Sequence, residues 1–507
     1  MRDPFARLTR RQRWHSRAWR LRRLVTRAAA PHRRRPSGAA SPHLLAIGVD
    51  TLRADHLGCG GCARATSPRL DALAAGGTLF ADVMAPAPWT LPSFAGALTG
   101  LMPGRHGGFL GGPARNMDRQ APGRLRPGVV TLAAHLQAQG YRTAAFYANQ
   151  FFAFGLAESF QEHAYFNLPA RDLADMAGDW LERNSDHPCF CFVLLNDPHE
   201  PTTPPWAELA PFLPVPTPDD VLLAELARWG GGRVPHLGRV PDPQAQAVQA
   251  ARALKLAVYD ATIAQVDRAL GSLHDRLLSS GLAERTLMTV FSDHGEEFLD
   301  HAAWAARWDH DPRGLRGIGH GQSHFQELLH VPWLAWGAGV PVGARVEGPV
   351  SLLDLAPTLL EWLGQPPLPP PPLPPQVGAA LAAALSGRSQ APAAARAAGG
   401  KPGLATAEPL RLAEAIAYGP DLVAVRRGHW KLIATRDGRP LALFDLERDP
   451  GELADASAAA PEILRDLLAV AAAWQRSGLG AAGDDGGAWG DLDDTVRDRL
   501  RDLGYTQ

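Results

Sequence analysis

The sequence predicts an α/β fold, in which a mostly parallel sheet has helices on both faces and a small antiparallel unit follows at the C-terminus. Three strand-like apolar runs, 44–49, 190–195 and 286–291, support this prediction. Strands buried on both faces of a sheet read as continuous apolar segments of this kind. Helix-like stretches such as 259–270 lie between the runs. This alternation is typical of a parallel sheet with crossover helices.

Composition divides the chain into four predicted segments. They are a basic extension (1–40), a main α/β domain (41–364), a Pro- and Ala-rich linker (365–410) and a C-terminal unit (411–507). The extension holds 13 Arg and one acidic residue, Asp3, without the apolar centre of a signal peptide. We expect it to be disordered; contact with an anionic lipid surface or nucleic acid is the alternative. Eight prolines between 366 and 375 mark the linker.

The remaining composition is that of a globular protein, with 46% hydrophobic and 20% charged residues. No run of 18 apolar residues exists, so we expect no membrane-spanning helix and a cytoplasmic or peripheral membrane location. The two cysteine pairs, Cys59 with Cys62 and Cys189 with Cys191, are expected to be buried thiols rather than a zinc site or disulfides. No specific nucleic-acid binding is expected, and the oligomeric state is left open.

Polar residues follow each strand-like run. Asp50 follows the first run, 196–199 follow the second, Asp293 and His294 follow the third, and Thr90 begins a helix-like segment. Ligands bind at the carboxyl ends of the strands in a parallel sheet, so these groups are expected to meet in one pocket. Their oxygen and nitrogen donors suit one divalent ion, with Mn, Mg, Ca and Zn all possible. The predicted metal ligands are Asp50, Thr90, Asp293 and His294.

Thr90 is the predicted nucleophile. It stands where the helix-like run 91–98 begins, and Pro92 is tolerated that early in a helix. A helix start presents free N–H groups and the positive end of the helix dipole, which favour an alkoxide and a bound oxyanion. The alternative is that the Thr90 hydroxyl only caps the helix.

Several motifs in order resemble the sulfatase family of the alkaline phosphatase superfamily. They lie at 50–58, 66–74, 98–107, 197–199, 292–297, 425–433 and 443–452. The resemblance implies an alkaline-phosphatase-like fold, with 41–364 as the catalytic domain and 411–507 as its C-terminal subdomain. It also implies catalytic roles for His199 and His320, on the leaving group or the transferred group. Asn149 and His301 are expected to contact the substrate.

The sequence also departs from the family pattern. Sulfatases use a Cys or Ser that is oxidised to formylglycine, within a Cys-x-Pro-Ser-Arg-like motif. Here Thr90, which is not a substrate for that oxidation, takes the first place, and Phe94 takes the place of the Arg. No cation stands near Asn149, where the family has a Lys and a His. These departures resemble the phosphodiesterases, phosphonate hydrolases and headgroup transferases of the superfamily.

Three functions are therefore considered. The first is a metal-dependent hydrolase of phosphodiesters, phosphonates or, less favoured, sulfate esters, acting on a small-molecule, lipid or glycan ester. The second is a transferase that moves a phosphoryl-linked headgroup through a covalent Thr90 intermediate. The third is a binding protein without catalysis. The complete set of predicted ligands argues against the third, and the lack of a membrane-spanning run argues against the second.

Overall fold

The computed structural model describes a subset of the 507 residues. They are 41–112, 114–200, 204–213, 244, 246–308, 311–315, 317–369, 372–373, 377–399 and 409–478. The predicted basic extension, 1–40, lies outside the described residues. No helix among these residues has the length and apolar character needed to cross a bilayer.

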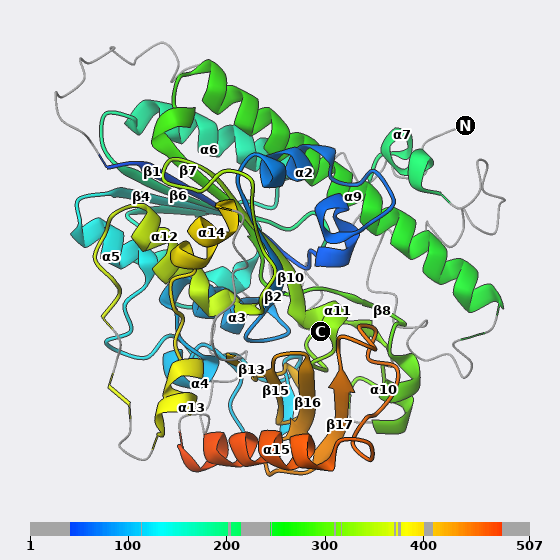
Figure 1. Cartoon of the computed structure of the whole chain (residues 1–507). Coiled ribbons are helices and arrows are strands. Elements are labelled where there is room, and N and C mark those ends of the chain that lie inside the picture. The colour runs from blue at the N-terminus through cyan, green and yellow to red at the C-terminus, as the bar shows by residue number, and fades with distance from the viewer. Residues whose placement is uncertain are drawn as a thin grey trace.

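The centre of the molecule is a nine-stranded sheet (Figure 1). Its order is β11 (Ala344–Val346), β2 (Thr78–Met84), β10 (His330–Gly337), β7 (Thr286–Ser292), β1 (His43–Val49), β6 (Cys189–Leu195), β4 (Arg142–Tyr147) and β5 (Glu162–Tyr165), and β12 (Val350–Ser351) also pairs with β2. Only β10 runs antiparallel to its neighbours in this sheet. The predicted mostly parallel sheet is confirmed.

Helices cover both faces of this sheet (Figure 1). One face carries α2 (Pro68–Ala75), α6 (Ala170–Asn184) and α9 (Gln246–Ser279), and the other carries α3 (Thr90–Thr99), α5 (Leu132–Ala138), α12 (Leu355–Trp362) and α14 (Ala391–Ala398). Successive side chains of β1 alternate between the two cores: Leu44 packs on the α3 side and Leu45 on the α9 side. Each fully buried Leu contributes about 1.5–3 kcal/mol, which explains the continuous apolar run.

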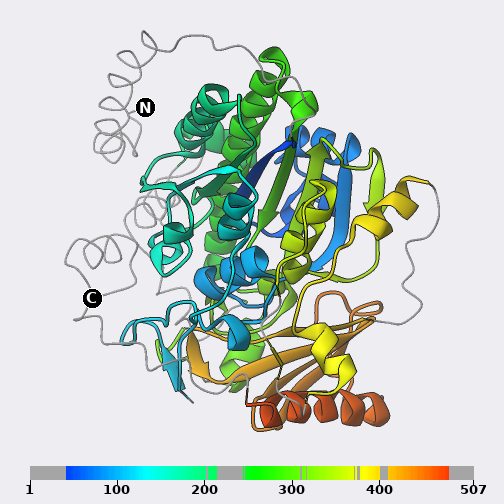
Figure 2. The same cartoon turned by 90° about the vertical axis from the view of Figure 1, so that its left-hand side faces the viewer.

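A second, smaller sheet follows in the chain and is antiparallel (Figure 2). It contains β13 (Leu410–Ala413), β15 (Leu422–Arg427), β16 (Trp430–Thr435) and β17 (Pro440–Asp445). Helix α15 (Pro461–Arg476) packs against it through the buried Trp474. The predicted C-terminal antiparallel unit is thus confirmed. The predicted linker contains two helices, α13 (Ala379–Ala384) and α14.

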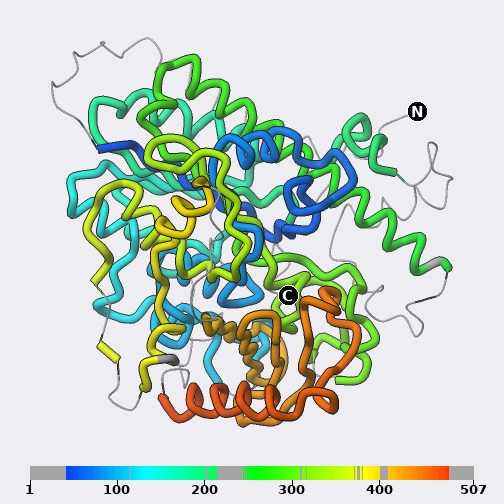
Figure 3. The backbone as a smooth tube through the Cα atoms, viewed as in Figure 1, coloured from blue at the N-terminus to red at the C-terminus, as the bar shows by residue number. Residues whose placement is uncertain are grey.

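Short elements connect these layers. They are α4 (Pro103–His106), α7 (Trp206–Leu209), α10 (Ala302–Trp308), α11 (Gln326–Leu329), β3 (Ala114–Asn116), β8 (Glu297–Phe298), β9 (Ile318–Gly319) and β14 (Tyr418–Pro420), with short 3-10 turns between them. The long helix α9 crosses the whole molecule (Figure 3). It therefore packs along the sheet and also reaches the loops at the carboxyl ends of the strands.

Candidate active site

The register of the central strands brings the predicted site together. Val49, the last residue of β1, pairs with Leu195 of β6 and with Ser292 of β7. The residues that follow these three strands therefore form one row at the carboxyl edge: Asp50, Asn196 and Asp293. Tyr147 of β4 pairs with Leu194, so Asn149 joins the same edge.

Three of the predicted metal ligands face one another in this row. His294 Nε2 lies 3.5 Å from Asp50 Oδ1 and 3.3 Å from Asp293 Oδ2, and all three side chains are fully buried. His294 Nδ1–H donates to the Gly295 carbonyl at 2.9 Å, so the Nε2 lone pair faces the two carboxylates. None of the facing atoms has a hydrogen-bond partner. Acceptors that meet without a donor fit a divalent cation well.

Burial sets the ionisation of these groups when no cation is bound. It raises the pKa of Asp50 to about 7, with Asn149 opposing the shift, and raises the pKa of Asp293 well above its usual range. Burial also keeps His294 neutral by lowering its pKa. A cation reverses this balance because it stabilises both carboxylates in their charged form. Binding of a metal must therefore release protons.

We expect the metal affinity of the protein to fall as the pH falls through about 7, the pKa of Asp50. Protons compete for the same oxygens, so the loss should approach about tenfold per pH unit for each proton displaced. Equilibrium dialysis of Mn²⁺ against chelator-treated protein between pH 5.5 and 8.5 measures this. An affinity that does not change over that range would contradict the assignment of these carboxylates.

Thr90 is the first residue of α3, and its hydroxyl is not the helix cap. Trp89 occupies the N-cap position and makes no side-chain capping bond, so the alternative reading of Thr90 as a cap is wrong. Asn149 Nδ2 lies 2.6 Å from Asp50 Oδ2 and 3.4 Å from Thr90 Oγ1. The Phe151 N–H donates to Asn149 Oδ1 at 2.9 Å, which turns the amide nitrogen toward those oxygens. Asn149 thus links the predicted nucleophile to a predicted metal ligand.

Both predicted catalytic histidines lie beside this cluster. The His320 ring is 4.5 Å from the His294 ring and 5.0 Å from the His199 ring, centroid to centroid. His320 Nδ1 lies 3.2 Å from a carboxylate oxygen of Glu296, and both side chains are buried. His199 Nδ1–H donates to the Glu200 carbonyl at 2.5 Å. Each histidine therefore has one ring nitrogen held by a neighbour.

Comparison with known proteins identifies the family. The sulfatase family model matches residues 42–365. The chain belongs to the sulfatase family. It is 30% identical over 218 residues to Arylsulfatase K of Danio rerio, covering 42% of this chain and 35% of that protein. It is 23% identical over 377 residues to a sulfatase of Formosa agariphila, covering 64% and 69% of the two chains. The match to Arylsulfatase K thus spans about a third of the length of that protein.

Solved sulfatase-like structures share the fold. The phosphonate monoester hydrolase of Agrobacterium radiobacter superposes with a TM-score of 0.61 at 21% identity, covering 85% of this chain and 95% of that chain. A protein solved with its substrate D-glucosamine-2-N,6-O-disulfate gives a TM-score of 0.64 at 16% identity, covering 86% and 98%. At these identities the likeness shows the alkaline-phosphatase-like fold that the family resemblance implied.

The packing of the core accounts for one departure from the sulfatase pattern, the phenylalanine at position 94. Phe94, where the family motif has an Arg, is fully buried and makes edge-to-face contacts with Phe192 and Phe291. Gly48 of β1 makes this possible, because a Cβ there would lie 2.4 Å from the Phe94 ring. Position 94 therefore belongs to the apolar core on the α3 side of the sheet. No charge is supplied from it.

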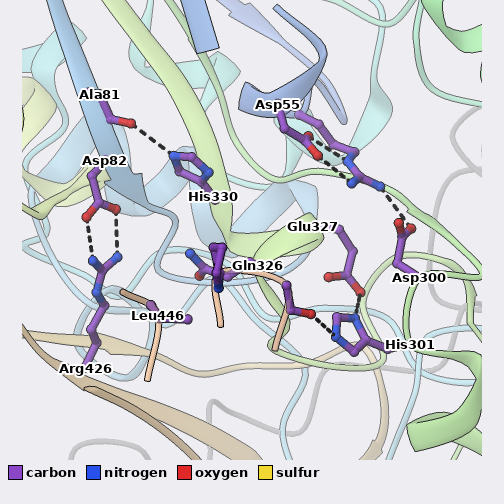
Figure 4. Close-up of a pocket in the computed structure, with 13 residues that line it drawn as sticks. Asp55, Ala81, Asp82, Asp300, His301, Gln326, Glu327, His330, Arg426 and Leu446 are labelled. Carbon is purple, nitrogen blue, oxygen red and sulfur yellow. Dashed lines mark hydrogen bonds and ion pairs between the residues drawn. The ribbon is translucent and has the colours of Figure 1, made fainter. Parts of the chain in front are cut away.

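His301, a predicted substrate contact, lies in a different group of side chains from Asp50, Asp293 and His294. Its Nδ1 binds Glu327 at 2.7 Å, and its Nε2 donates to the Gly451 carbonyl at 3.0 Å (Figure 4). Burial opposes a charge on His301, but Glu327 raises its pKa to about 9, so the ring is an imidazolium. It lines a separate cavity of about 550 Å³ between the main domain and the C-terminal unit. The chain passes through β8 between His294 and His301, and this turns the latter away.

Sequence reasoning missed two buried charged residues near the site. Glu296 sits against His320, and Lys255 of α9 forms an ion pair with Glu200. Glu296 was detectable because it lies two residues after His294, within the same polar segment that follows β7. Lys255 carried no such signal, since a lysine on a long helix is ordinarily solvated.

Proposed function

We propose that this protein is a metal-dependent ester hydrolase that cleaves phosphodiesters or phosphonate monoesters through unmodified Thr90. The observation that carries the proposal is the contact from Asn149 to both Thr90 Oγ1 and Asp50 Oδ2. It couples a hydroxyl at the start of a helix to a buried cluster of metal-ligand type. Neither a helix cap nor a binding protein requires that arrangement.

In the proposed reaction, the Thr90 hydroxyl releases its proton to solvent, Thr90 Oγ attacks phosphorus, and the bond to the leaving oxygen breaks. His199 or His320 gives a proton to that oxygen as it departs. Water then attacks the phosphorus of the threonine ester and gives one proton to the same histidine, and the Thr90 oxygen takes up a proton from solvent as the acid product leaves. A divalent ion held by Asp50, Asp293 and His294 would supply positive charge for the nucleophile and the oxyanion. The free N–H groups that begin α3 add to that stabilisation.

The groups around Thr90 support a singly charged phosphorus ester over a sulfate ester. A formylglycine hydrate expels sulfate with its second hydroxyl, and Thr90 has none, so water must clear the covalent ester. The neighbours of Thr90 in the row are the neutral amides of Asn149 and Asn196. The buried carboxylate of Glu296 adds negative charge nearby. A dianionic phosphate monoester would meet few fixed cations in this arrangement, so the charge of these groups favours a phosphodiester or phosphonate monoester over it.

A panel of aryl esters tests this preference. We expect metal-loaded protein to cleave aryl phosphodiesters and aryl phosphonate monoesters with kcat/KM values at least about tenfold above those for matched aryl sulfates. A neighbour in fold was solved with a sulfated sugar, so glycan sulfates belong in the panel. Metal-stripped protein is the control. Faster turnover of the sulfates would contradict the proposal. Product carrying an added acceptor alcohol would instead identify a transferase.

A further inference from the structure

The turn after Asp50 has a strained backbone. Thr51 adopts a φ of +59°, and it is the only β-branched residue among the four non-glycine residues with positive φ that the structure describes. A β-branched residue rarely occupies this left-handed region, because its branched side chain crowds the neighbouring carbonyl. Thr51 is fully buried, and its own hydroxyl has no partner. Its hydroxyl therefore does not hold the conformation through a hydrogen bond.

Tyr259, which is 208 positions away in the chain, holds this turn through its hydroxyl. The Tyr259 hydroxyl, on α9, donates to the Thr51 carbonyl at 2.6 Å and accepts the Arg53 N–H at 2.9 Å. The ring of Tyr259 packs beside His56 and Phe298, so the hydroxyl is fixed in place. One side chain thus satisfies a buried acceptor and a buried donor on either side of the turn.

The turn lies directly against the Asp50 and Asp293 carboxylates. The Asp50 N–H donates to the Leu195 carbonyl at 2.9 Å, which fixes the residue at the end of β1. The Thr51 N–H faces the carboxylates of Asp50 and Asp293. A change of φ at Thr51 would rotate its carbonyl and the path of the following residues. It would also disturb the bond from the Leu52 N–H to Ser292 Oγ, 2.9 Å long, which ties this turn to β7.

We propose that Tyr259 is a positioning residue for the metal site, because its hydroxyl holds Thr51 in the left-handed conformation that aims Asp50. The inference rests on the proposed metal site and adds a residue to it that touches neither ion nor substrate. Strain of this kind persists only when surrounding contacts enforce it. Glycine adopts the same conformation without strain, so a glycine at position 51 should make the brace unnecessary.

A double-mutant cycle of Tyr259→Phe and Thr51→Gly tests the proposal. Mn²⁺ binding is measured by equilibrium dialysis of chelator-treated full-length protein. We expect Tyr259→Phe to weaken Mn²⁺ binding about tenfold or more, as loss of a supporting contact to a ligand typically does. In the Thr51→Gly background the same change should cost less than about threefold. Tyr141→Phe is the matched control: Tyr141 is also buried but precedes β4, at the end of the sheet away from the site. It should bind Mn²⁺ as the wild type does.

Three results would overturn the proposal. The first is an unchanged Mn²⁺ affinity in Tyr259→Phe. The second is an equal loss in both backgrounds, since Tyr259 would then act without Thr51. The third is that Tyr259→Phe fails to fold and the double variant also fails, which would make the hydroxyl a requirement of the fold. A wild type that binds Mn²⁺ no better than Asp293→Asn would refute the metal site itself, and with it this role.

Discussion

Thr90→Ala is expected to lower kcat on the order of 10³-fold or more, because the variant has no oxygen to attack phosphorus. Mn²⁺ binding should weaken through loss of the Thr90 oxygen but survive, since Asp50, Asp293 and His294 remain in place. Steady-state kinetics on an aryl phosphodiester measures the rate, and dialysis measures the metal. Thr90→Ser, which restores a hydroxyl, should recover part of the activity.

The same helix supplies a matched control for this variant. Thr99 is buried at the other end of α3, and its hydroxyl donates to the Ala95 carbonyl at 2.6 Å and accepts the Leu101 N–H at 3.3 Å, away from the candidate site. Thr99→Ala should therefore keep the rate within a few fold of wild type. Near-normal turnover by Thr90→Ala, or an equal loss in both variants, would remove Thr90 from the reaction.

Asp293→Asn is expected to abolish metal binding and, with it, turnover. Both Asp293 oxygens lie buried without a hydrogen-bond partner, so a bound cation would be the main compensation for their charge. We expect the loss in Mn²⁺ affinity to exceed the roughly 10–100-fold cost of removing a mere supporting contact. Activity should fall toward that of metal-stripped wild type.

Asp293→Asn is expected to stabilise the metal-free protein, although it removes metal binding. Burial and the neighbouring Asp50 raise the pKa of Asp293, so its charged form destabilises the metal-free fold as the pH rises. Metal-free Asp293→Asn should therefore have a higher Tm than metal-free wild type at pH 8. Asp267→Asn is the contrast, because the Asp267 carboxylate accepts the Arg69 and Leu70 N–H groups, at 3.0 and 2.8 Å. That variant should lose Tm and keep its metal. The reverse pattern would contradict the assignment.

The sequence could predict that Asp50, Asp293 and His294 lie together because two features of its pattern are geometric. The apolar runs end at residues that pair in register, so Asp50 and Asp293 had to share one edge of the sheet. His294 follows Asp293 directly and could not lie far away. The sheet, its covering helices and the C-terminal unit followed from the same alternation of strand and helix.

Other features depend on contacts that no local pattern encodes. His301 lies only seven residues after His294, yet β8 and its pairing with β9 carry it to Glu327. The sequence showed Phe94 only as the loss of the positively charged Arg of the family motif. Its place in an aromatic core depends on the space that Gly48 leaves on β1. The left-handed conformation of Thr51 could not be predicted from the sequence, because threonine rarely adopts it. The hydroxyl that holds the turn belongs to Tyr259, 208 positions away in the chain.

The central claim is that Thr90, unmodified, carries the phosphoryl or phosphonyl group during turnover. Peptide mass spectrometry of active protein, before substrate and after acid quench during turnover of an aryl phosphonate, tests it most directly. We expect an unaltered threonine at position 90 in the resting protein, and a phosphonyl ester on that residue after the quench. A formylglycine-type oxidation at position 90, or a covalent adduct on any other residue, would contradict it.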